Sequence, residues 1–265
     1  MKDTKWFSNQ VVLVTGASGG LGAQIALELA RRDVKLILVA RNESKLEQVA
    51  AECKSFTSKP VDIYSCDLTN DASVNELLAT LDKSHKITMV INNAGLGYFK
   101  LAKDLSESEI SQMLQLNLNA LIKITQHFVP RFIEAKSGVF VNIASQAGKS
   151  ATAKSSVYSA TKFGVLGYSN ALRLELKPYG IHVMTVNPGP IATDFFDKAE
   201  PTGKYLEQLG SVVLDPVKVA GEVVKGIERE KREVNLPKSM NFASKLNILF
   251  PKIGDKLLGS IFNKK

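Results

Sequence analysis

A phenol and an ammonium stand four residues apart in the stretch YSATK, at residues 158–162. Residues at this spacing lie one turn apart on the same face of a helix, so Tyr158 and Lys162 would be neighbours there. A free phenol, with a pKa of ~10, is poorly matched to neutral pH, and a nearby ammonium favours the phenolate and lowers that pKa. The pair is therefore a candidate for general acid–base proton transfer. The same spacing also occurs by chance on ordinary helices, so the rest of the chain must show whether this pair is catalytic.

Six short apolar runs supply the elements that would position such a pair. Each has the length of a strand, is rich in β-branched residues and shows little polar alternation, which is typical of strands buried on both faces of a parallel sheet. The longer segments between the runs have helical periodicity. This alternation predicts an α/β fold: a Rossmann-like, doubly wound parallel sheet of about seven strands with helices on both faces. The runs cover residues 11–14, 36–40, 61–66, 87–91, 138–143 and 181–186.

The domain organisation predicted from the sequence is one continuous domain over residues 1–230 and a basic extension over residues 231–265. A helix from Pro216 to about Glu230 closes the domain. The extension carries eight Lys/Arg and two Asp/Glu, and therefore +6 of the formal net charge of +8. The rest of the chain is nearly neutral and lacks a broad basic face with aromatic elements, which argues against a nucleic-acid partner.

The composition indicates a cytoplasmic globular protein. Apolar residues make up 45% of the 265 and charged residues 23%, which is ordinary for a packed domain. No apolar run approaches the ~18–20 residues of a membrane-spanning helix, and the polar N-terminus does not resemble a secretory signal. Cys53 and Cys66 are the only cysteines. They are too few for a disulfide framework or a zinc cluster, and are expected to be reduced packing residues.

The first predicted strand leads directly into TGASGGLG, residues 15–22, and then into a helix. Glycines in such a turn let the backbone approach a pyrophosphate, which rests against the positive end of the helix dipole. Gly16, Gly20 and Gly22 form a T-G-x-x-x-G-x-G pattern rather than the common G-x-G-x-x-G. The position of the turn between a strand and an amphipathic helix predicts a dinucleotide cofactor.

The end of the second predicted strand discriminates between nicotinamide cofactors. Enzymes that use NAD usually carry an acidic residue there, which binds the adenosine ribose hydroxyls. Here the strand ends in Ala40 and Arg41. A guanidinium at this point suits a 2′-phosphate, so the sequence favours NADP(H).

Seven motifs, in one order and spacing, resemble the single-domain branch of the short-chain dehydrogenase/reductase (SDR) family over roughly residues 9–230. They are TGASGGLG (15–22), Asp67 in CDLT, NNAG (92–95), Asn117 in LQLNLNA, Ser145 in VNIASQAG, YSATK (158–162) and NPGPIAT (187–193). The resemblance implies an NADP(H)-dependent oxidoreductase that reduces a ketone or aldehyde to an alcohol, or catalyses the reverse. It also implies a homodimer or homotetramer.

The resemblance assigns four catalytic residues. Tyr158 would be the general acid/base, and Lys162 would bind the nicotinamide ribose and complete a proton relay through water to Asn117. Ser145 would bond the substrate oxygen and stabilise its developing charge. Together with Arg41, the cofactor residues are Gly16, Ser18, Gly20, Leu21, Gly22, Asp67, Leu68, Asn93, Ala94, Gly95, Tyr158, Lys162, Pro188, Gly189, Ile191 and Thr193.

Two other functions are weighed against the reductase. One is a catalytically silent NADP-binding sensor or scaffold, which the intact Asn-Ser-Tyr-Lys set argues against. The other is a sugar-nucleotide epimerase, whose larger C-terminal substrate domain this chain has little room to build. His85, His127 and His182 match no motif and have no mutual ligand spacing, so no metal site is expected.

The segment expected to bind substrate is a lid near residues 194–212. Phe195, Phe196 and Tyr205 predict an apolar or aromatic cleft, suited to an apolar or lipid-like carbonyl. The substrate itself is left open, from fatty-acyl, steroid-like and sphingoid ketones to xenobiotic carbonyls.

The basic extension predicts two short amphipathic helices, over residues 241–250 and 251–265. Phe242, Leu246 and Leu249 fall on one face of the first, and Ile253, Leu257 and Ile261 on one face of the second, while Lys245, Lys252, Lys256, Lys264 and Lys265 supply positive charge. One interpretation is reversible, peripheral attachment to an anionic membrane. The other, which we favour at this point because the helices are short and broken by Pro251, packs the apolar stripes on the subunit or a partner subunit beside the substrate cleft.

Overall fold

The computed structural model describes residues 2–203, 207 and 210–252. Its centre is a single seven-stranded sheet in the order β3-β2-β1-β4-β5-β6-β7, with every neighbouring pair parallel. The strands are β1 (Val11–Thr15), β2 (Lys35–Ala40), β3 (Val61–Ser65), β4 (Met89–Asn92), β5 (Gly138–Ile143), β6 (Ile181–Pro188) and β7 (Glu233–Leu236). This confirms the predicted doubly wound parallel sheet.

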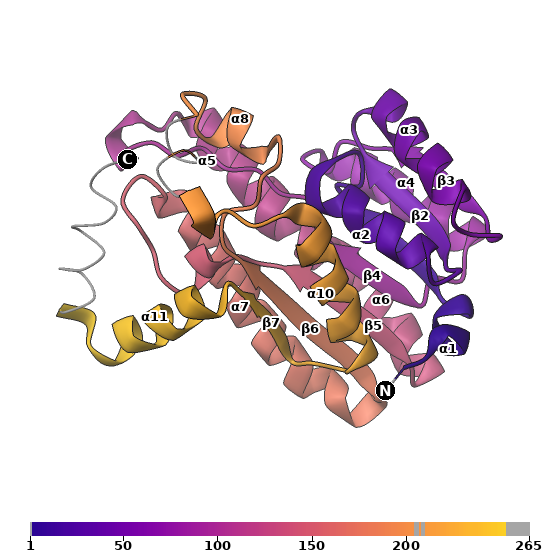
Figure 1. Ribbon diagram of the computed structural model, residues 1–265. Helices are drawn as coiled ribbons and strands as arrows, with labels where there is room; N and C mark the ends of the chain where they lie inside the picture. The colour runs from indigo at the N-terminus through magenta and orange to yellow at the C-terminus, as the bar shows by residue number, and fades with distance from the viewer. Residues whose placement is uncertain (1, 204–206, 208–209, 253–265) are drawn as a thin grey trace.

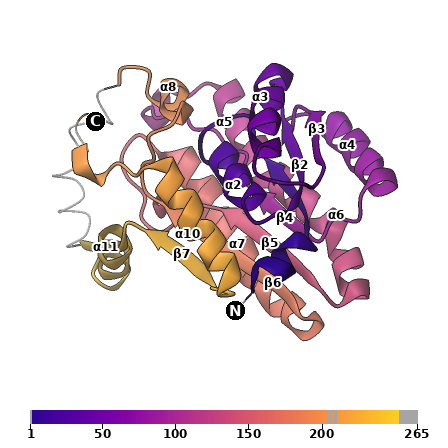
Figure 2. The same ribbon diagram turned by 45° about the vertical axis from the view of Figure 1, so that its right-hand side comes forward.

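Helices cover both faces of the sheet, which gives three layers (Figures 1 and 2). Successive residues of β1 divide between two cores, because side chains alternate across a strand. Val12 and Val14 pack under α2, α3 and α10, whereas Leu13 packs under α4, α6 and α7. The helices are α1 (Thr4–Ser8), α2 (Gly20–Ala30), α3 (Glu43–Lys54), α4 (Asp71–Ser84), α5 (Glu107–Leu114), α6 (Ala120–Ala135), α7 (Ser156–Leu176), α8 (Phe195–Ala199), α10 (Pro216–Glu228) and α11 (Lys238–Leu249).

The seventh strand corrects the predicted domain boundary. β7 pairs with β6 from Thr185 opposite Glu233 to Pro188 opposite Leu236, so the sheet continues beyond residue 230 into the segment assigned to the extension. Its sequence, EVNL, alternates polar and apolar residues because it forms the edge of the sheet, and only Val234 is buried. The helix predicted from Pro216 is present as α10 and ends at Glu228.

The basic extension forms one described helix, α11, which contacts β7 and the turn after β5. It agrees with the first of the two predicted amphipathic helices. The second lies almost entirely outside the described residues, as does Tyr205. Within the described part of the chain, no helix is long and apolar enough to cross a membrane.

The order of the strands places a crevice at the carboxyl edge of the sheet. The chain winds outward from β1 through β2 to β3 and then returns to β4 on the other side of β1. The loops after β1 and β4 therefore leave the sheet in opposite directions, and a parallel sheet binds ligands at such a switch point.

Candidate active site

A cavity of about 690 Å³ lies along the carboxyl edge of the sheet, and it brings together most of the residues singled out in the sequence. Residues from the loops after β1, β2, β4, β5 and β6 line it together with α7 and α11. The predicted residues that line it are Gly16, Ser18, Gly20, Leu21, Arg41, Leu68, Asn93, Ala94, Gly95, Ser145, Tyr158, Lys162, Pro188, Gly189, Ile191 and Thr193. Gly22 and Asn117 do not line it but lie against the lining residues Gly16 and Gly95, and Asp67 lies between the lining residues Cys66 and Leu68.

The glycine-rich turn requires glycine at three positions for geometric reasons. Gly16 and Gly20 have φ angles of +66° and +54°, a region that other residues rarely adopt. A Cβ on Gly22 would lie 2.2 Å from the Gly16 carbonyl oxygen, so no side chain fits there. Gly19 gives α2 no side-chain cap, and the space beside it is open. The start of α2 lines the cavity through Gly20 and Leu21, where its first N–H groups are available to a phosphate group.

Asn93 braces this turn from the next strand along the sheet. Its side-chain amide donates to the carbonyl oxygens of Thr15 and Gly16, at 3.0 and 3.2 Å. The Thr15 hydroxyl in turn accepts from the backbone N–H groups of Asn93 and Ala94, at 3.0 and 3.1 Å. The β4 loop thus fixes the position of the glycine-rich turn.

At the end of the crevice beside β2, Ala40 is followed by two basic residues that line the cavity, Arg41 and Lys45. The sequence reasoning found Arg41 but missed Lys45, which lies four residues on, in the first turn of α3. Lys45 Nζ is 3.6 Å from a carboxylate oxygen of Asp194, the residue that follows Thr193 in the lid. This end of the cavity is therefore positively charged, and its donor set fits a phosphate on the adenosine ribose.

Asp67 lines a second hollow beside the first rather than the main cavity. Partial burial acts to raise the pKa of its carboxyl, but hydrogen bonds from Thr69 and the nearby Arg41 charge hold that pKa below its usual value. One of its oxygens accepts from both the backbone N–H and the hydroxyl of Thr69, at 3.0 and 2.7 Å. Its neighbour Leu68 lines the main cavity, and Cys66 lines both.

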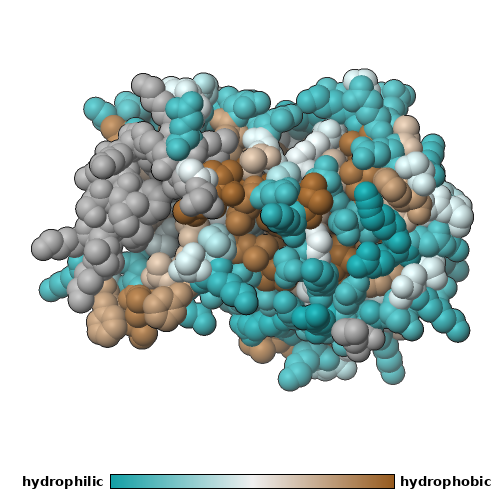
Figure 3. Space-filling model, in the orientation of Figure 1, coloured by the Kyte–Doolittle hydropathy of each residue, from teal (hydrophilic) through white to brown (hydrophobic). Residues whose placement is uncertain are grey.

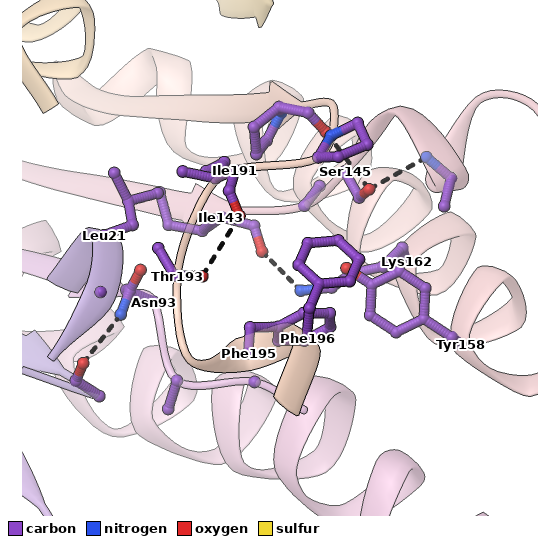
Figure 4. Close-up of a pocket in the computed structure, with 18 of the residues that line it drawn as sticks. Leu21, Asn93, Ile143, Ser145, Tyr158, Lys162, Ile191, Thr193, Phe195 and Phe196 are labelled. Carbon is purple, nitrogen blue, oxygen red and sulfur yellow. Dashed lines mark hydrogen bonds between the residues drawn. The ribbon is translucent and has the colours of Figure 1, made fainter. Parts of the chain in front are cut away.

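Three of the four predicted catalytic side chains converge on the wall opposite the glycine-rich turn (Figure 4). Tyr158 and Lys162 lie on successive turns of α7, and both are buried. Lys162 Nζ donates to the Ile143 carbonyl oxygen at 2.9 Å and is 5.8 Å from the centre of the Tyr158 ring. Ser145 follows β5, and its hydroxyl lines the same cavity, where it accepts from the Ala147 N–H at 3.1 Å. A phenol, a hydroxyl and an amine therefore share one small space.

The structure corrects the expectation that Lys162 lowers the pKa of Tyr158. Burial raises the pKa of the Tyr158 phenol to about 12, and only the nearby Ser145 hydroxyl acts in the other direction. Burial likewise lowers the pKa of the Lys162 ammonium to about 8. Desolvation is the largest cause of both shifts, because both groups are removed from water. Tyr158 is consequently protonated at neutral pH.

A stability prediction follows from the buried ammonium. The unfolded chain keeps a proton on Lys162 up to a pH of about 10.5, whereas the folded chain releases it above about 8. The lysine therefore destabilises the fold fully below pH 8, and this penalty disappears as the pH rises to about 10.5. Lys162→Met removes both the cost of burying the ammonium and the stabilisation from its hydrogen bond to the Ile143 carbonyl. Because the cost is the larger of the two, the substitution should raise the free energy of unfolding at pH 7 by about 1–2 kcal/mol.

Urea unfolding of Lys162→Met at pH 7 and pH 9.5 measures this effect. The difference in free energy of unfolding between the variant and the wild type should be smaller at the higher pH. Lys177→Met, at an exposed lysine after the end of α7, is the matched control and should show no such pH dependence. A Met variant that is less stable than the wild type at pH 7 would contradict the prediction.

Asn117 lies in a π-helical segment, Gln115–Asn119, between α5 and α6. Its side-chain oxygen accepts from the Leu96 N–H at 2.8 Å, and its nitrogen donates to the Leu96 carbonyl and the Thr161 hydroxyl, at 2.8 and 3.1 Å. A Cβ on Gly95 would lie 3.3 Å from the Asn117 oxygen and 3.6 Å from Lys162 Nζ. Asn117 thus packs against the catalytic wall, and its side chain ties the β4 loop to α7.

The far end of the cavity is apolar and aromatic. Phe99 packs edge-on against Tyr158, with ring centres 5.5 Å apart, and against Phe195 and Phe196 of α8, at 6.3 and 6.0 Å. Helix α11 supplies another part of this wall through Met240, Ala243 and Ser244. The sequence reasoning anticipated the two lid phenylalanines but missed Phe99 and the α11 residues. No motif marks these positions, because the fold alone brings them to the site.

The remaining candidates have structural roles. Cys53 and Cys66 are free and buried, and burial raises the pKa of their thiols to about 12 and about 11. His85 is hydrogen-bonded to the Tyr64 hydroxyl at 2.7 Å, and His127 to Asp82 at 2.8 Å. Over residues 2–203, 207 and 210–252, no three His, Cys, Asp or Glu side chains group as metal ligands do.

Comparison with known proteins agrees with this geometry. The sequence model of the short chain dehydrogenase family matches residues 10–203. A ketoacyl reductase, HetN, from Nostoc sp. is 34% identical, over 86% of this chain and 78% of its own length. A short-chain dehydrogenase from Sphingobium yanoikuyae, solved in complex with NADPH, superposes with a TM-score of 0.80 at 29% identity, over 91% of this chain and 96% of the other.

A bulky-bulky ketone specific alcohol dehydrogenase from Comamonas testosteroni gives a TM-score of 0.78 at 27% identity, over 92% of this chain and 94% of its own. The family match covers well over half of the chain, and it includes the glycine-rich turn, Ser145, Tyr158 and Lys162. The chain therefore belongs to the short-chain dehydrogenase/reductase family of oxidoreductases.

Proposed function

We propose that the protein is an NADP(H)-dependent reductase of a bulky, uncharged, apolar ketone or aldehyde. One observation carries this proposal: the Ser145, Tyr158 and Lys162 side chains share a cavity with the uncapped N-terminus of α2. A phosphate-binding helix end and a proton donor in one cavity are what hydride and proton transfer to a carbonyl require. The NADPH complex of the Sphingobium relative supports the cofactor assignment.

In this proposal NADPH supplies the hydride, and residues of the chain bind the substrate oxygen and donate a proton to it. Ser145 donates a hydrogen bond to the carbonyl oxygen and stabilises the negative charge that develops there. Tyr158 donates its proton to the same oxygen. The phenol is suited to this step because its pKa of about 12 keeps it protonated at neutral pH.

Lys162 and Asn117 act around this proton donor. Lys162 would hold the nicotinamide ribose hydroxyls with the amine that now donates to the Ile143 carbonyl. Asn117 is hydrogen-bonded to Leu96 in the β4 loop and to Thr161 in α7. It therefore fixes α7 relative to this loop and positions Lys162. The relay through water that joins them remains a prediction of this proposal.

The substrate class follows from the character of the cavity wall. Arg41, Lys45 and Asp194 lie at the end of the cavity beside β2, and Lys162 belongs to the catalytic set. Among the described residues, the far end offers aromatic rings, Met240, Ala243 and the hydroxyls of Ser150 and Thr152. A charged substrate group would lose its hydration there without a partner, which is costly. The wall therefore suits a carbonyl that carries large apolar substituents.

The test is NADPH consumption by the purified protein across a panel of bulky aryl and alkyl ketones, charged keto acids, small aldehydes and quinones. The proposal expects turnover that is greatest for bulky apolar ketones and lowest for keto acids. Tight NADPH binding without turnover on any carbonyl would favour the alternative of a silent sensor or scaffold. Sedimentation velocity on the same preparation tests the predicted homodimer or homotetramer.

A further inference from the structure

Helix α11 has one face toward the cavity and an opposite face away from the protein. Its inner face carries Met240, Ala243 and Ser244, which line the cavity. Two side-chain contacts hold this face in place: Lys149 Nζ donates to Asn241 at 3.3 Å and Asn247 donates to the Ser150 hydroxyl at 3.2 Å. The orientation of the helix is therefore set by the turn after β5, and its opposite face must point away from the protein.

That opposite face is apolar and exposed. Phe242, Leu246 and Leu249 recur at helical spacing, and their exposed fractions are 65%, 43% and 69%. Ile248 and Phe250 at the end of the helix are exposed as well. Apolar side chains gather over α11 at the lower left of Figure 3. Contiguous apolar patches on a protein surface mark interaction sites. Within the described part of the chain these side chains are not covered by their own subunit, which was one half of our favoured sequence interpretation; its other half, packing on a partner subunit, is not tested by a single chain.

Charge indicates which partner fits this face. Lys238, Lys245 and Lys252 accompany the apolar stripe, and no Asp or Glu occurs from residue 238 to residue 252. A twofold contact between two copies would bring this face against itself and place like charges together. An anionic lipid surface instead accepts both features, because apolar side chains enter the interface while lysines contact the headgroups.

We propose that the outer face of α11 docks the protein on an anionic lipid surface. This inference does not depend on the proposed reaction, since it rests on the exposed stripe and its lysines. The helix would lie in the plane of the interface, with Phe242, Leu246 and Leu249 facing the acyl chains. Because the inner face of the same helix lines the cavity, docking places the catalytic cavity one helix thickness from the lipid.

The experiment is co-sedimentation of the full chain with mixed phosphatidylserine/phosphatidylcholine vesicles and with phosphatidylcholine vesicles, at low and high salt. We expect binding to the mixed vesicles that weakens as salt rises. The double variant Phe242→Ser/Leu249→Ser should lower the affinity by about 100-fold. Lys245→Gln/Lys252→Gln should lower it by about 30-fold at low salt, at roughly 5-fold for each lysine.

Matched controls change exposed residues of the same kind elsewhere. Leu174→Ser on α7 removes an apolar side chain that is 72% exposed, and Lys54→Gln/Lys83→Gln removes two lysines from α3 and α4. Both should bind vesicles as the wild type does. Unchanged thermal melting in all variants shows that they are folded, since every altered side chain is exposed.

A second readout reports insertion directly. The only tryptophan, Trp6, lies in α1, on the side of the molecule away from α11 (Figure 1). Phe242→Trp should therefore add fluorescence that brominated lipids quench, beyond any quenching seen in the wild type. Absence of vesicle binding, or binding that neither double variant weakens, would overturn the proposal. Concentration-dependent dimerisation that Phe242→Ser/Leu249→Ser abolishes, without vesicle binding, would assign this face to a second copy and overturn it as well.

Discussion

Tyr158→Phe is expected to bind NADPH as the wild type does and to lose turnover by ~10² or more, because its only change is the removal of the proposed proton donor. The phenylalanine ring keeps the packing against Phe99 and Phe195, whose ring centres lie 5.5 and 5.8 Å from that of Tyr158. The aromatic wall should therefore survive the substitution. What is lost is the phenolic hydroxyl, which lines the cavity together with Ser145.

Steady-state kinetics on the best ketone of the panel, together with cofactor titration, measures this effect. Tyr168→Phe is the matched control, since Tyr168 lies on the same helix and is also partly buried, with a pKa raised to about 12 by burial. It should leave kcat within a few-fold of the wild type. A wild-type kcat in Tyr158→Phe would exclude the phenol as proton donor.

Arg41→Ala is expected to weaken NADPH binding by roughly one to two decades and to leave NADH binding nearly unchanged. The reason is the loss of one charge-assisted contact to the 2′-phosphate, worth about 1.5–3 kcal/mol. Arg41 follows Ala40 at the carboxyl end of β2, and it lines the cavity together with Lys45. The wild type should accordingly prefer NADPH to NADH.

Titration of both cofactors into wild type, Arg41→Ala and Arg31→Ala tests this preference. Arg31 is the control, because its guanidinium stacks on Phe56, 3.9 Å from the ring centre, and does not line the cavity. Equal affinities of the wild type for NADPH and NADH would show that Arg41 does not read the phosphate. A loss in Arg41→Ala that is the same for both cofactors would point instead to damage of the β2 turn.

Local sequence predicted the elements in which each residue has a local reason for its identity. The five interior strands, β1, β2, β4, β5 and β6, are apolar runs because both of their faces are covered, so their positions follow from composition alone. The glycine-rich turn was equally readable, since the +66° and +54° φ angles of Gly16 and Gly20 require glycine. The spacing of Tyr158 and Lys162 needs only the 3.6-residue period of a helix.

The tertiary structure alone decided features that depend on segments far apart in the chain. β7 became a strand because β6 offers it a pairing edge, and its four residues carry no strand signal strong enough to be read alone. Helix α11 became part of the cavity wall because Lys149 and Ser150, about ninety residues earlier, hold it there. The pKa of Tyr158 was decided in the same way. Helical spacing brings Lys162 near the phenol, but only the packed fold determines how much water is excluded, and exclusion of water raised the pKa that spacing alone was expected to lower.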